Sequence, residues 1–408
     1  MPLPPLRNID AVPVEHEGQT LVCLLDPEGY AGEQLALSPP AFYIASLLDG
    51  ANDVSDIQYA FLNQFGQVPA AEQIRDIVDA LDGAGFLITP RFQAMRARVE
   101  SDFRNATVRP AHMAGGTYPL DPEELRAFLD EQFTREGGPG ERPPSNGSAH
   151  EVAVRCLVSP HIDYQRGGHS YAHGYLRLAR GPTPEVILVF GVAHNGPPVP
   201  FVLTRKDFET PLGTVHTDLA FVEALESACA WDPYQYEILH RTEHSIELQV
   251  VMLAHLFGSA VKIVPILCGP FRGYSERENG VAPQVDAFLD RCRDLIAGSD
   301  RRVSVIAGAD LAHVGQRFGD DFEIDDRVIQ RVEARDREDL AYAASLDPQG
   351  FYRSVMKDDN ERRVCGINCI YAALRSVEGI ANPGQVLHYG HGADPAGGIV
   401  TFADVVFM

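Results

Sequence analysis

From residue 152 onward, short apolar runs alternate with longer amphipathic stretches. This alternation is typical of an α/β domain, in which helices cover the faces of a sheet. We find no repeat at a fixed short period, so solenoids and propellers are excluded. The pattern predicts five strands, which cover residues 152–160, 185–193, 261–269, 303–310 and 398–407.

The N-terminal third has a different pattern. Residues 38–90 contain three stretches with apolar residues at helical spacing, followed by a short apolar strand. Ser38 before two prolines, Ser55 with Asp56, and the glycines at 83 and 85 mark the expected helix ends. Three helices and a β wing predict a small α+β, winged-helix-like unit.

Between these parts, residues 91–107 predict a connecting helix, and a Pro-started helix is expected within 110–134. Residues 135–151 are rich in Gly, Pro and Ser and predict an exposed loop. We therefore expect two domains, covering residues 1–104 and 105–408.

Composition and charge restrict the class of protein. The chain has 408 residues, is 45% hydrophobic and carries a net charge of −23, which repels nucleic acid and anionic membranes. It has no apolar run long enough to span a bilayer, and its first 20 residues lack the character of a signal peptide. Seven scattered cysteines are unlike a secreted disulfide framework. We expect a cytoplasmic protein that binds neither nucleic acid nor membrane.

Histidines follow three of the predicted strands. His161 and His194 come directly after the first two strands, and His313 follows the fourth, with Asp310 three residues before it. Ligands of open α/β sheets bind beyond the carboxyl ends of the strands, and neutral imidazole is the commonest protein metal ligand. A single such histidine is usually a satisfied polar residue, but three at one edge favour a metal site.

Two further motifs offer ligands. If helical, His240, His244 and Glu247 share one face, and His240-x-x-Glu243-His244 also matches a zinc-protease signature, which would be a rival site. Cys365 precedes an apolar helical stretch, where a helix N-terminus favours a thiolate. It is either a soft metal ligand or a small buried side chain.

Residues 38–90 resemble the PqqD-like family. The matching pieces are Leu47-Leu48-Asp49-Gly50, which ends an apolar helix, and the stretch from Leu81 to Leu87 before the wing. This resemblance implies a domain that binds peptides or docks onto partner enzymes. A DNA-binding wing is the alternative, which the acidic balance of the segment disfavours.

The rest of the chain resembles the Memo family, whose bacterial and archaeal members are called AmmeMemoRadiSam system protein B. The resemblance begins at the turn of residues 114–119 and continues to the C-terminus. Its most specific motifs are Ser159-Pro160-His161-x-x-Tyr164, Gly191-x-x-His194, Thr210-Pro211-Leu212-Gly213, Glu243-His244-Ser245-Ile246-Glu247, Asp310-x-x-His313-x-Gly315 and Cys365-Gly366.

This resemblance implies a fold like that of class III extradiol dioxygenases, a mixed sheet flanked by helices. It implies that His161, His194 and Cys365 hold the metal, with Fe(II) expected and copper or zinc as alternatives. Asp310 and His313 fall where the dioxygenases keep a general base, so we expect His313, oriented by Asp310, to transfer protons. Five further residues are expected in the substrate pocket or next to the ligands: Tyr164, Asp163, Glu243, His244 and Glu247.

Two positions depart from the family pattern. Asp163 stands where many relatives have Gly, and Leu311-Ala312 replaces an aromatic-Cys pair. The extra carboxylate of Asp163 either joins the groups around the metal ligands or hydrogen-bonds the turn.

The leading hypothesis is a metal-binding, dioxygenase-like protein that acts on an unknown small molecule within a radical-enzyme-associated modification system. The alternative is a non-catalytic module that retains the metal pocket and binds a peptide or a partner radical enzyme through its N-terminal domain. The thiol ligand keeps this alternative open, because extradiol chemistry uses two histidines and a carboxylate.

Overall fold

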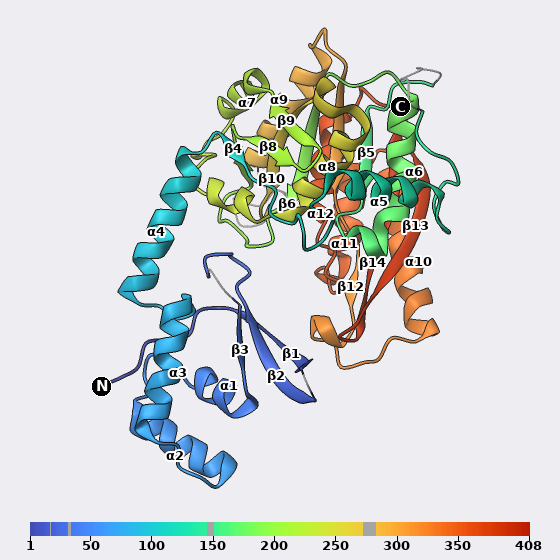
Figure 1. Cartoon of the computed structure of the whole chain (residues 1–408). Coiled ribbons are helices and arrows are strands. Elements are labelled where there is room, and N and C mark those ends of the chain that lie inside the picture. The colour runs from blue at the N-terminus through green and yellow to red at the C-terminus, as the bar shows by residue number, and fades with distance from the viewer. Residues whose placement is uncertain (17, 32–33, 145–150, 272–282) are drawn as a thin grey trace. The chain divides into compact units, whose positions relative to one another are not determined.

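The computed structural model describes residues 1–16, 18–31, 34–144, 151–271 and 283–408 (Figure 1). The chain divides into two compact units, Met1–Asn105 and Ala106–Met408. Part of the exposed loop expected over residues 135–151, namely residues 145–150, lies outside the described residues.

The first unit begins with an antiparallel sheet in the order β1-β2-β3 and continues with helices around one apolar core. Ser38 caps the first helix, as expected, but Asp53 caps the second in a capping box with Asp56, two residues before the predicted start. Gly85, at a φ of 84°, ends the third helix. The elements are β1 (Asp10–His16), β2 (Gln19–Leu25), β3 (Leu35–Leu37), α1 (Pro39–Ser46), α2 (Val54–Phe65), α3 (Ala71–Ala84) and α4 (Pro90–Asn105).

The three helices of residues 38–90 and the connecting helix are therefore present, but the expected strand after the third helix is wrong. Leu87 forms only an isolated bridge with Leu6. The sheet of this unit comes instead from residues 10–37, before the helices. Phe86 and Leu87 are apolar because their side chains are buried in the core, and this burial does not require residues 85–90 to form a strand.

The second unit contains, among its described residues, an 11-stranded mixed sheet. Its main path is β12-β14-β5-β11-β6-β10-β9-β8-β4, with β13 paired to β14 and β7 paired to β10. The strands are β4 (Val108–Arg109), β5 (Cys156–Ser159), β6 (Val186–Val192), β7 (Phe201–Leu203), β8 (Asp207–Thr210), β9 (Gly213–Thr217), β10 (Lys262–Cys268), β11 (Val303–Gly308), β12 (His313–Val314), β13 (Gln385–Asp394) and β14 (Gly398–Phe407).

All five predicted strands are present, the first one shortened to four residues. In the centre of the sheet, β5, β11, β6 and β10 run parallel. Each is apolar and almost wholly buried, as expected for parallel strands covered on both faces. Strand β14 runs antiparallel to β5, which makes the sheet mixed.

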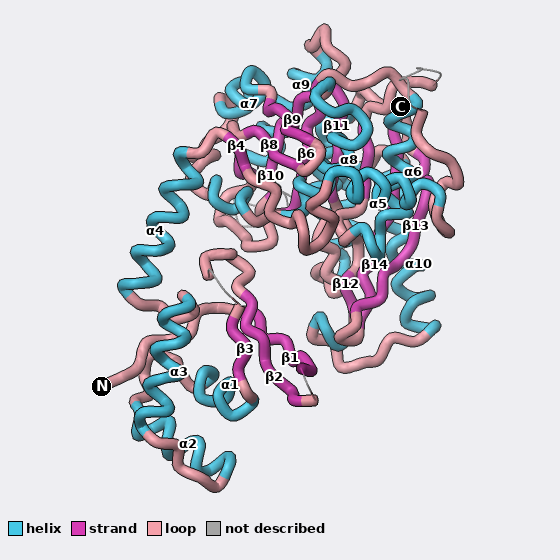
Figure 2. Tube along the Cα trace, in the orientation of Figure 1, coloured by secondary structure: helices cyan, strands magenta, loops and turns pink. Residues whose placement is uncertain are grey.

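Helices cover both faces of this sheet (Figure 2). One core packs the sheet against α7, α9, α10, α11 and α12, and the other packs it against α5, α6 and α8. Their bounds are α5 (Pro122–Thr134), α6 (Tyr164–Arg180), α7 (Leu219–Glu226), α8 (His244–Phe257), α9 (Pro283–Ala297), α10 (Asp326–Ala344), α11 (Pro348–Val355) and α12 (Ile367–Val377), with short 3-10 turns at Glu237–Arg241, Gly258–Ala260, Gln316–Phe318 and Met356–Asp358.

The expected architecture, an α/β domain with a mixed sheet flanked by helices, is therefore confirmed for the second unit. Within the described ranges, we find no helix with the length and apolar character that crossing a membrane requires.

Candidate metal centre

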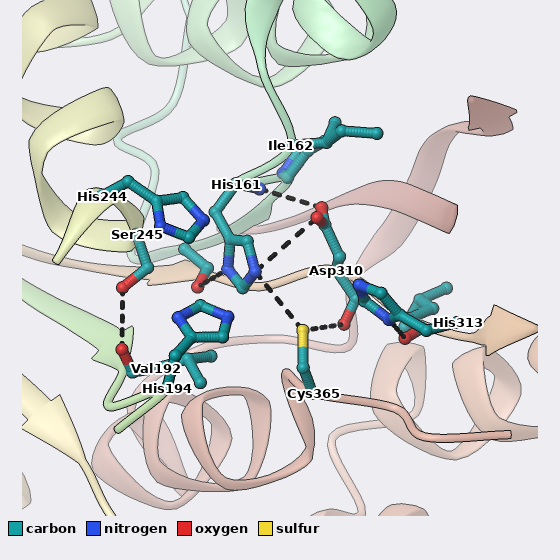
Figure 3. Close-up of polar contacts among 12 residues, drawn as sticks. His161, Ile162, Val192, His194, His244, Ser245, Asp310, His313 and Cys365 are labelled. Carbon is teal, nitrogen blue, oxygen red and sulfur yellow. Dashed lines mark hydrogen bonds and ion pairs between the residues drawn. The ribbon is translucent and has the colours of Figure 1, made fainter. Parts of the chain in front are cut away.

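The carboxyl ends of three parallel strands meet at one place in the sheet. Strand β11 lies between β5 and β6, so His161, which follows β5, and His194, which follows β6, approach each other across the end of β11. The centroids of the two rings are 5.1 Å apart. The two strands are thus not neighbours, yet their parallel direction brings both imidazoles to the same edge (Figure 3).

Backbone contacts fix the ring of His161. Its Nδ1 lies 2.9 Å from the carbonyl oxygen of Gly308, the last residue of β11. A carbonyl only accepts, so Nδ1 carries the hydrogen, and the neutral ring leaves a lone pair on Nε2. That Nε2 faces the sulfur of Cys365 at 3.3 Å. Burial, with a further contribution from His194, lowers the pKa of His161 to about 3, so its ring is neutral at pH 7.

A carboxylate fixes the ring of His194. Both carboxylate oxygens of Glu243 lie 3.0 Å from the Nδ1 of His194, and the backbone N–H of His194 donates to the same carboxylate at 3.1 Å. Although burial opposes it, this carboxylate raises the pKa of His194 well above its usual value. In the absence of a metal, His194 is therefore an imidazolium paired with Glu243.

A third imidazole joins this pair. His244, the first residue of α8, stacks on His194 with a centroid distance of 4.8 Å and places its Nδ1 3.3 Å from Glu243. Its ring is also 5.3 Å from that of His161. The side chains of His194 and His244 are 37% and 33% exposed, so the group opens to solvent on this side. Burial lowers the pKa of His244 to about 4, which keeps it neutral at pH 7.

The thiol of Cys365 enters the group from the opposite face of the sheet. It lies two residues before α12, and the neighbouring Gly366 packs so tightly that an added Cβ would lie 2.5 Å from the Cβ of Ala309. This close approach brings the sulfur to His161 and to the carbonyl of Asp310, at 3.8 Å. Burial raises the pKa of Cys365 to about 11, against the effect of the helix start, which favours a thiolate.

The ligand atoms of His161, His194 and Cys365 all lie within 4.8 Å of one another. The donor set fits a metal, because imidazole and thiolate bind iron, copper and zinc, and a bound cation deprotonates a coordinating thiol. The ligand atoms of His194, Glu243 and His244 also lie within 4.8 Å of one another. There the Nδ1 of His194 is hydrogen-bonded to the carboxylate of Glu243, and the Nδ1 of His244 lies 3.3 Å from it, so this group orients His194, the imidazole that the two groups share.

Asp310 and His313 do not form the pair that we expected. The carboxylate of Asp310 accepts a hydrogen bond from the backbone N–H of His161 at 2.9 Å. The ring of His313 instead places Nδ1 3.1 Å from the carbonyl of Leu311 and packs edge-on against Phe318. Asp310 thus braces a candidate ligand, and the ring of His313 is oriented by the backbone carbonyl of Leu311, just before β12.

Three of the predicted pocket residues point elsewhere. Asp163 caps α6 through a 3.0 Å bond from the N–H of Arg166, which is the turn contact considered for it. The buried Tyr164 donates to the carbonyl of Leu248. Glu247 turns away from the three histidines and pairs with Arg109.

His240 is not brought to the histidine group either. It lies in the 3-10 turn before α8, and its Nε2 is 3.1 Å from the carbonyl of Val202. Because Thr242 and Glu243 separate this turn from α8, the segment is not one helix, and His240 and His244 do not share a helical face. The rival zinc site therefore lacks its first ligand.

Sequence reasoning missed Arg109, whose side chain is completely buried. It forms an ion pair with Glu247 and donates to the carbonyls of His240 at 2.8 Å and of Glu243 at 2.9 Å. It thereby holds the segment that leads into α8. A lone arginine at the end of a two-residue strand has no recognisable motif, so no sequence signal pointed to it.

Comparisons with known proteins agree with this architecture. A family model described as Memo-like protein matches residues 109–401. A MEMO1 family protein of Methanopyrus kandleri is 30% identical over 304 residues, which cover 73% of this chain and 98% of that protein.

Two other relatives extend the comparison. A MEMO1 family protein of Aquifex aeolicus is 27% identical over 387 residues, with 94% of each chain covered, so the similarity extends into the first unit. A MEMO1 family protein of Thermus thermophilus is 25% identical over 321 residues, which cover 79% of this chain and 89% of that protein. The chain belongs to the family of Memo-like proteins.

Proposed function

We propose that this protein is a metal-dependent, dioxygenase-like oxidoreductase in which His161, His194 and Cys365 hold the metal ion. The observation that carries the proposal is the convergence of these three ligand atoms within 4.8 Å at the carboxyl ends of the central strands. In both histidines the other ring nitrogen, Nδ1, is already hydrogen-bonded: to the Gly308 carbonyl in His161 and to Glu243 in His194.

Such engagement of the second nitrogen is the arrangement that metal-binding histidines usually have. It leaves Nε2 of His161 free to bind, and Nε2 of His194 once its proton is lost. We propose Fe(II) as the ion, with copper or zinc as alternatives, since the donor set suits each. When bound, Fe(II) supplies redox chemistry and Lewis acidity with coordination positions left open.

The chain's own residues would bind and orient a small substrate and move protons. His244 presents a neutral imidazole, 33% exposed, beside both histidine ligands, so it is positioned to exchange a proton with a bound molecule. His313 is a second candidate, on the far side of Asp310 (Figure 3). The side chains of His161 and Asp310 are buried and exclude water from one side of the site.

Metal analysis of protein purified without oxygen tests the metal site. The double variant His161→Ala, His194→Ala should carry about one ion fewer per chain than the wild-type chain. The exposed His216→Ala provides a matched control, because it removes an imidazole outside the site. Equal metal content in all three proteins would refute the site.

Oxygen consumption with a panel of catechols then tests the activity. Turnover that disappears in His244→Ala, with the metal retained, would support a dioxygenase-like reaction. The absence of turnover with metal bound would favour the second candidate function, a binding module that keeps the metal pocket. One observation supports this second candidate: the third donor is a thiol, whereas extradiol chemistry uses a carboxylate.

For the N-terminal unit we propose a PqqD-like role in which it binds a peptide or a partner radical enzyme. Within the described residues, β1 and β3 are the edge strands of the small sheet, where an extended peptide could add a strand, and Tyr59 and Val68 are exposed apolar side chains. Co-purification of the full chain with proteins of its own organism, compared with a chain lacking residues 1–105, tests this role. Identical partners in both would refute it.

A further inference from the structure

A second group of histidines lies away from the candidate centre, between α6 and β13. His169 and His173 are one helical turn apart on α6, and His388 lies on β13, which packs against that helix (Figure 1). The ring of His388 is 5.2 Å from that of His169 and stacks on that of His173 at 4.9 Å. Histidines four residues apart on a helix can bind one ion together.

Hydrogen bonds determine which nitrogen of His388 is free. The hydroxyl of Ser170 donates to the buried carboxyl group of Asp404, and the Nδ1 of His388 lies 3.0 Å from the same hydroxyl oxygen. A serine hydroxyl has one hydrogen, which Asp404 receives, so Nδ1 of His388 is the donor in the second bond. The lone pair of His388 is therefore on Nε2.

The other two rings also keep a nitrogen available. The Nε2 of His173 lies 2.9 Å from the carbonyl oxygen of Gly137, so it carries the hydrogen and leaves Nδ1 free. The Nδ1 of His169 is buried and has no hydrogen-bond partner among the residues that the structure describes. A buried polar atom without a partner is costly, and a bound ion would satisfy it.

We propose that His169, His173 and His388 form a second metal site, which takes a divalent transition-metal ion such as Zn²⁺. The chain Asp404–Ser170–His388 fixes the ring of His388, as hydrogen bonds to the second nitrogen do for the histidines of known metal sites. The net charge of −23 favours cations near the chain.

Binding requires a small rearrangement. Within the described residues, the groups whose ligand atoms already lie within 4.8 Å of one another do not include this trio, so at least one ring must rotate. His173 is only partly buried, and rotation of its ring costs the single bond to Gly137. The loss of one such bond is small beside the free energy of zinc coordination.

Zinc titration of a variant without the first centre tests the proposal. In the full-length double variant His161→Ala, Cys365→Ala, bound Zn²⁺ is measured by equilibrium dialysis and by competition with a chromophoric chelator. We expect about one equivalent per chain, with affinity reduced at least tenfold when His173→Ala or His388→Gln is added. The exposed His391→Ala, on the same strand as His388, should leave binding unchanged.

X-ray absorption of the zinc-loaded double variant should show nitrogen and oxygen neighbours without sulfur. Far-ultraviolet circular dichroism establishes that each variant is folded. No zinc binding by the double variant, or binding that neither His173→Ala nor His388→Gln weakens, would overturn the proposal. Because the first centre is disabled in this background, the outcome is independent of whether the proposed function is correct.

Discussion

Replacement of Arg109 by methionine should destabilise the second unit strongly. The guanidinium is completely buried, pairs with the equally buried Glu247, and donates to the backbone carbonyls of His240, Glu243 and Pro110. Methionine has a similar length and keeps most of the packing. The substitution therefore tests the charge and the hydrogen bonds.

The magnitude follows from these contacts. Removing one partner of a buried ion pair leaves the other charge uncompensated, which costs about 3–5 kcal/mol. The carbonyls add to this cost, but Glu247 keeps the hydrogen bonds from Tyr118 and from the backbone N–H of Met113, which stabilise its charge. We expect a total loss of about 4 kcal/mol in the free energy of unfolding.

The chain offers a convenient probe for the measurement. Trp231 is the single tryptophan of the chain and lies in the second unit, where its Nε1 donates to the carbonyl of Phe201. Urea denaturation followed by tryptophan fluorescence therefore reports on this unit without a contribution from the first.

A double-mutant cycle isolates the ion pair. The variant Arg109→Met, Glu247→Leu removes both charges, so its loss should be smaller than the sum of the two single losses by about 2 kcal/mol or more. Additive losses, or a change below about 1 kcal/mol for Arg109→Met, would refute the conclusion that this pair holds the segment leading into α8.

Three further predictions concern the candidate centre and its surroundings. Glu243→Gln should weaken metal binding about 10- to 100-fold, because it loses the carboxylate that orients His194; competition with a chelator measures this, and unchanged affinity would contradict it. Metal binding at pH 7 should release about two protons, one from the Cys365 thiol and one from His194. Burial raises the pKa of Cys365 to about 11, and Glu243 raises the pKa of His194 against the effect of burial. Calorimetry in buffers of different ionisation enthalpy counts the released protons, and equal release by Cys365→Ser would exclude the thiol as a source. Because burial lowers the pKa of His240 to about 3, the unfolded chain takes up a proton at this residue first as the pH falls below about 6.5. Stability should therefore decrease towards pH 3, by up to about 1.4 kcal/mol per pH unit, and His240→Gln should reduce this slope; an unchanged slope in urea denaturation would contradict it.

The central strands could be predicted from the sequence because both faces of them are buried. A continuous apolar run must be buried, and in a chain of this size the centre of a sheet covered on both faces is where such runs lie. The polar residue after each run then lies at the edge of the sheet where the strands end. This is why His161 and His194 could be singled out. Strand order could not be read in the same way, so the insertion of β11 between β5 and β6 was not foreseen.

Other elements left no comparable pattern. Every residue of β1 is exposed and Pro13 lies within the strand, so its pairing with β2, and not an apolar face, defines it. The partners of charged side chains could not be predicted from the sequence either. Asp310 and Glu247 carry the same group, yet one braces His161 and the other meets Arg109, a residue 138 positions away in the chain. Such pairings depend on tertiary packing.

The acceptor that sets the ring of His161 is the main-chain carbonyl of Gly308, with consequences for how this protein can vary. Substituting a side chain cannot delete that carbonyl, so the tautomer of His161 is insulated from most point mutations. Position 308 itself has little freedom, because a Cβ there would lie 2.5 Å from the backbone oxygen of Ser245. His194, which depends on the side chain of Glu243, has no such protection. Sequence drift should therefore alter the geometry of the second histidine before that of the first.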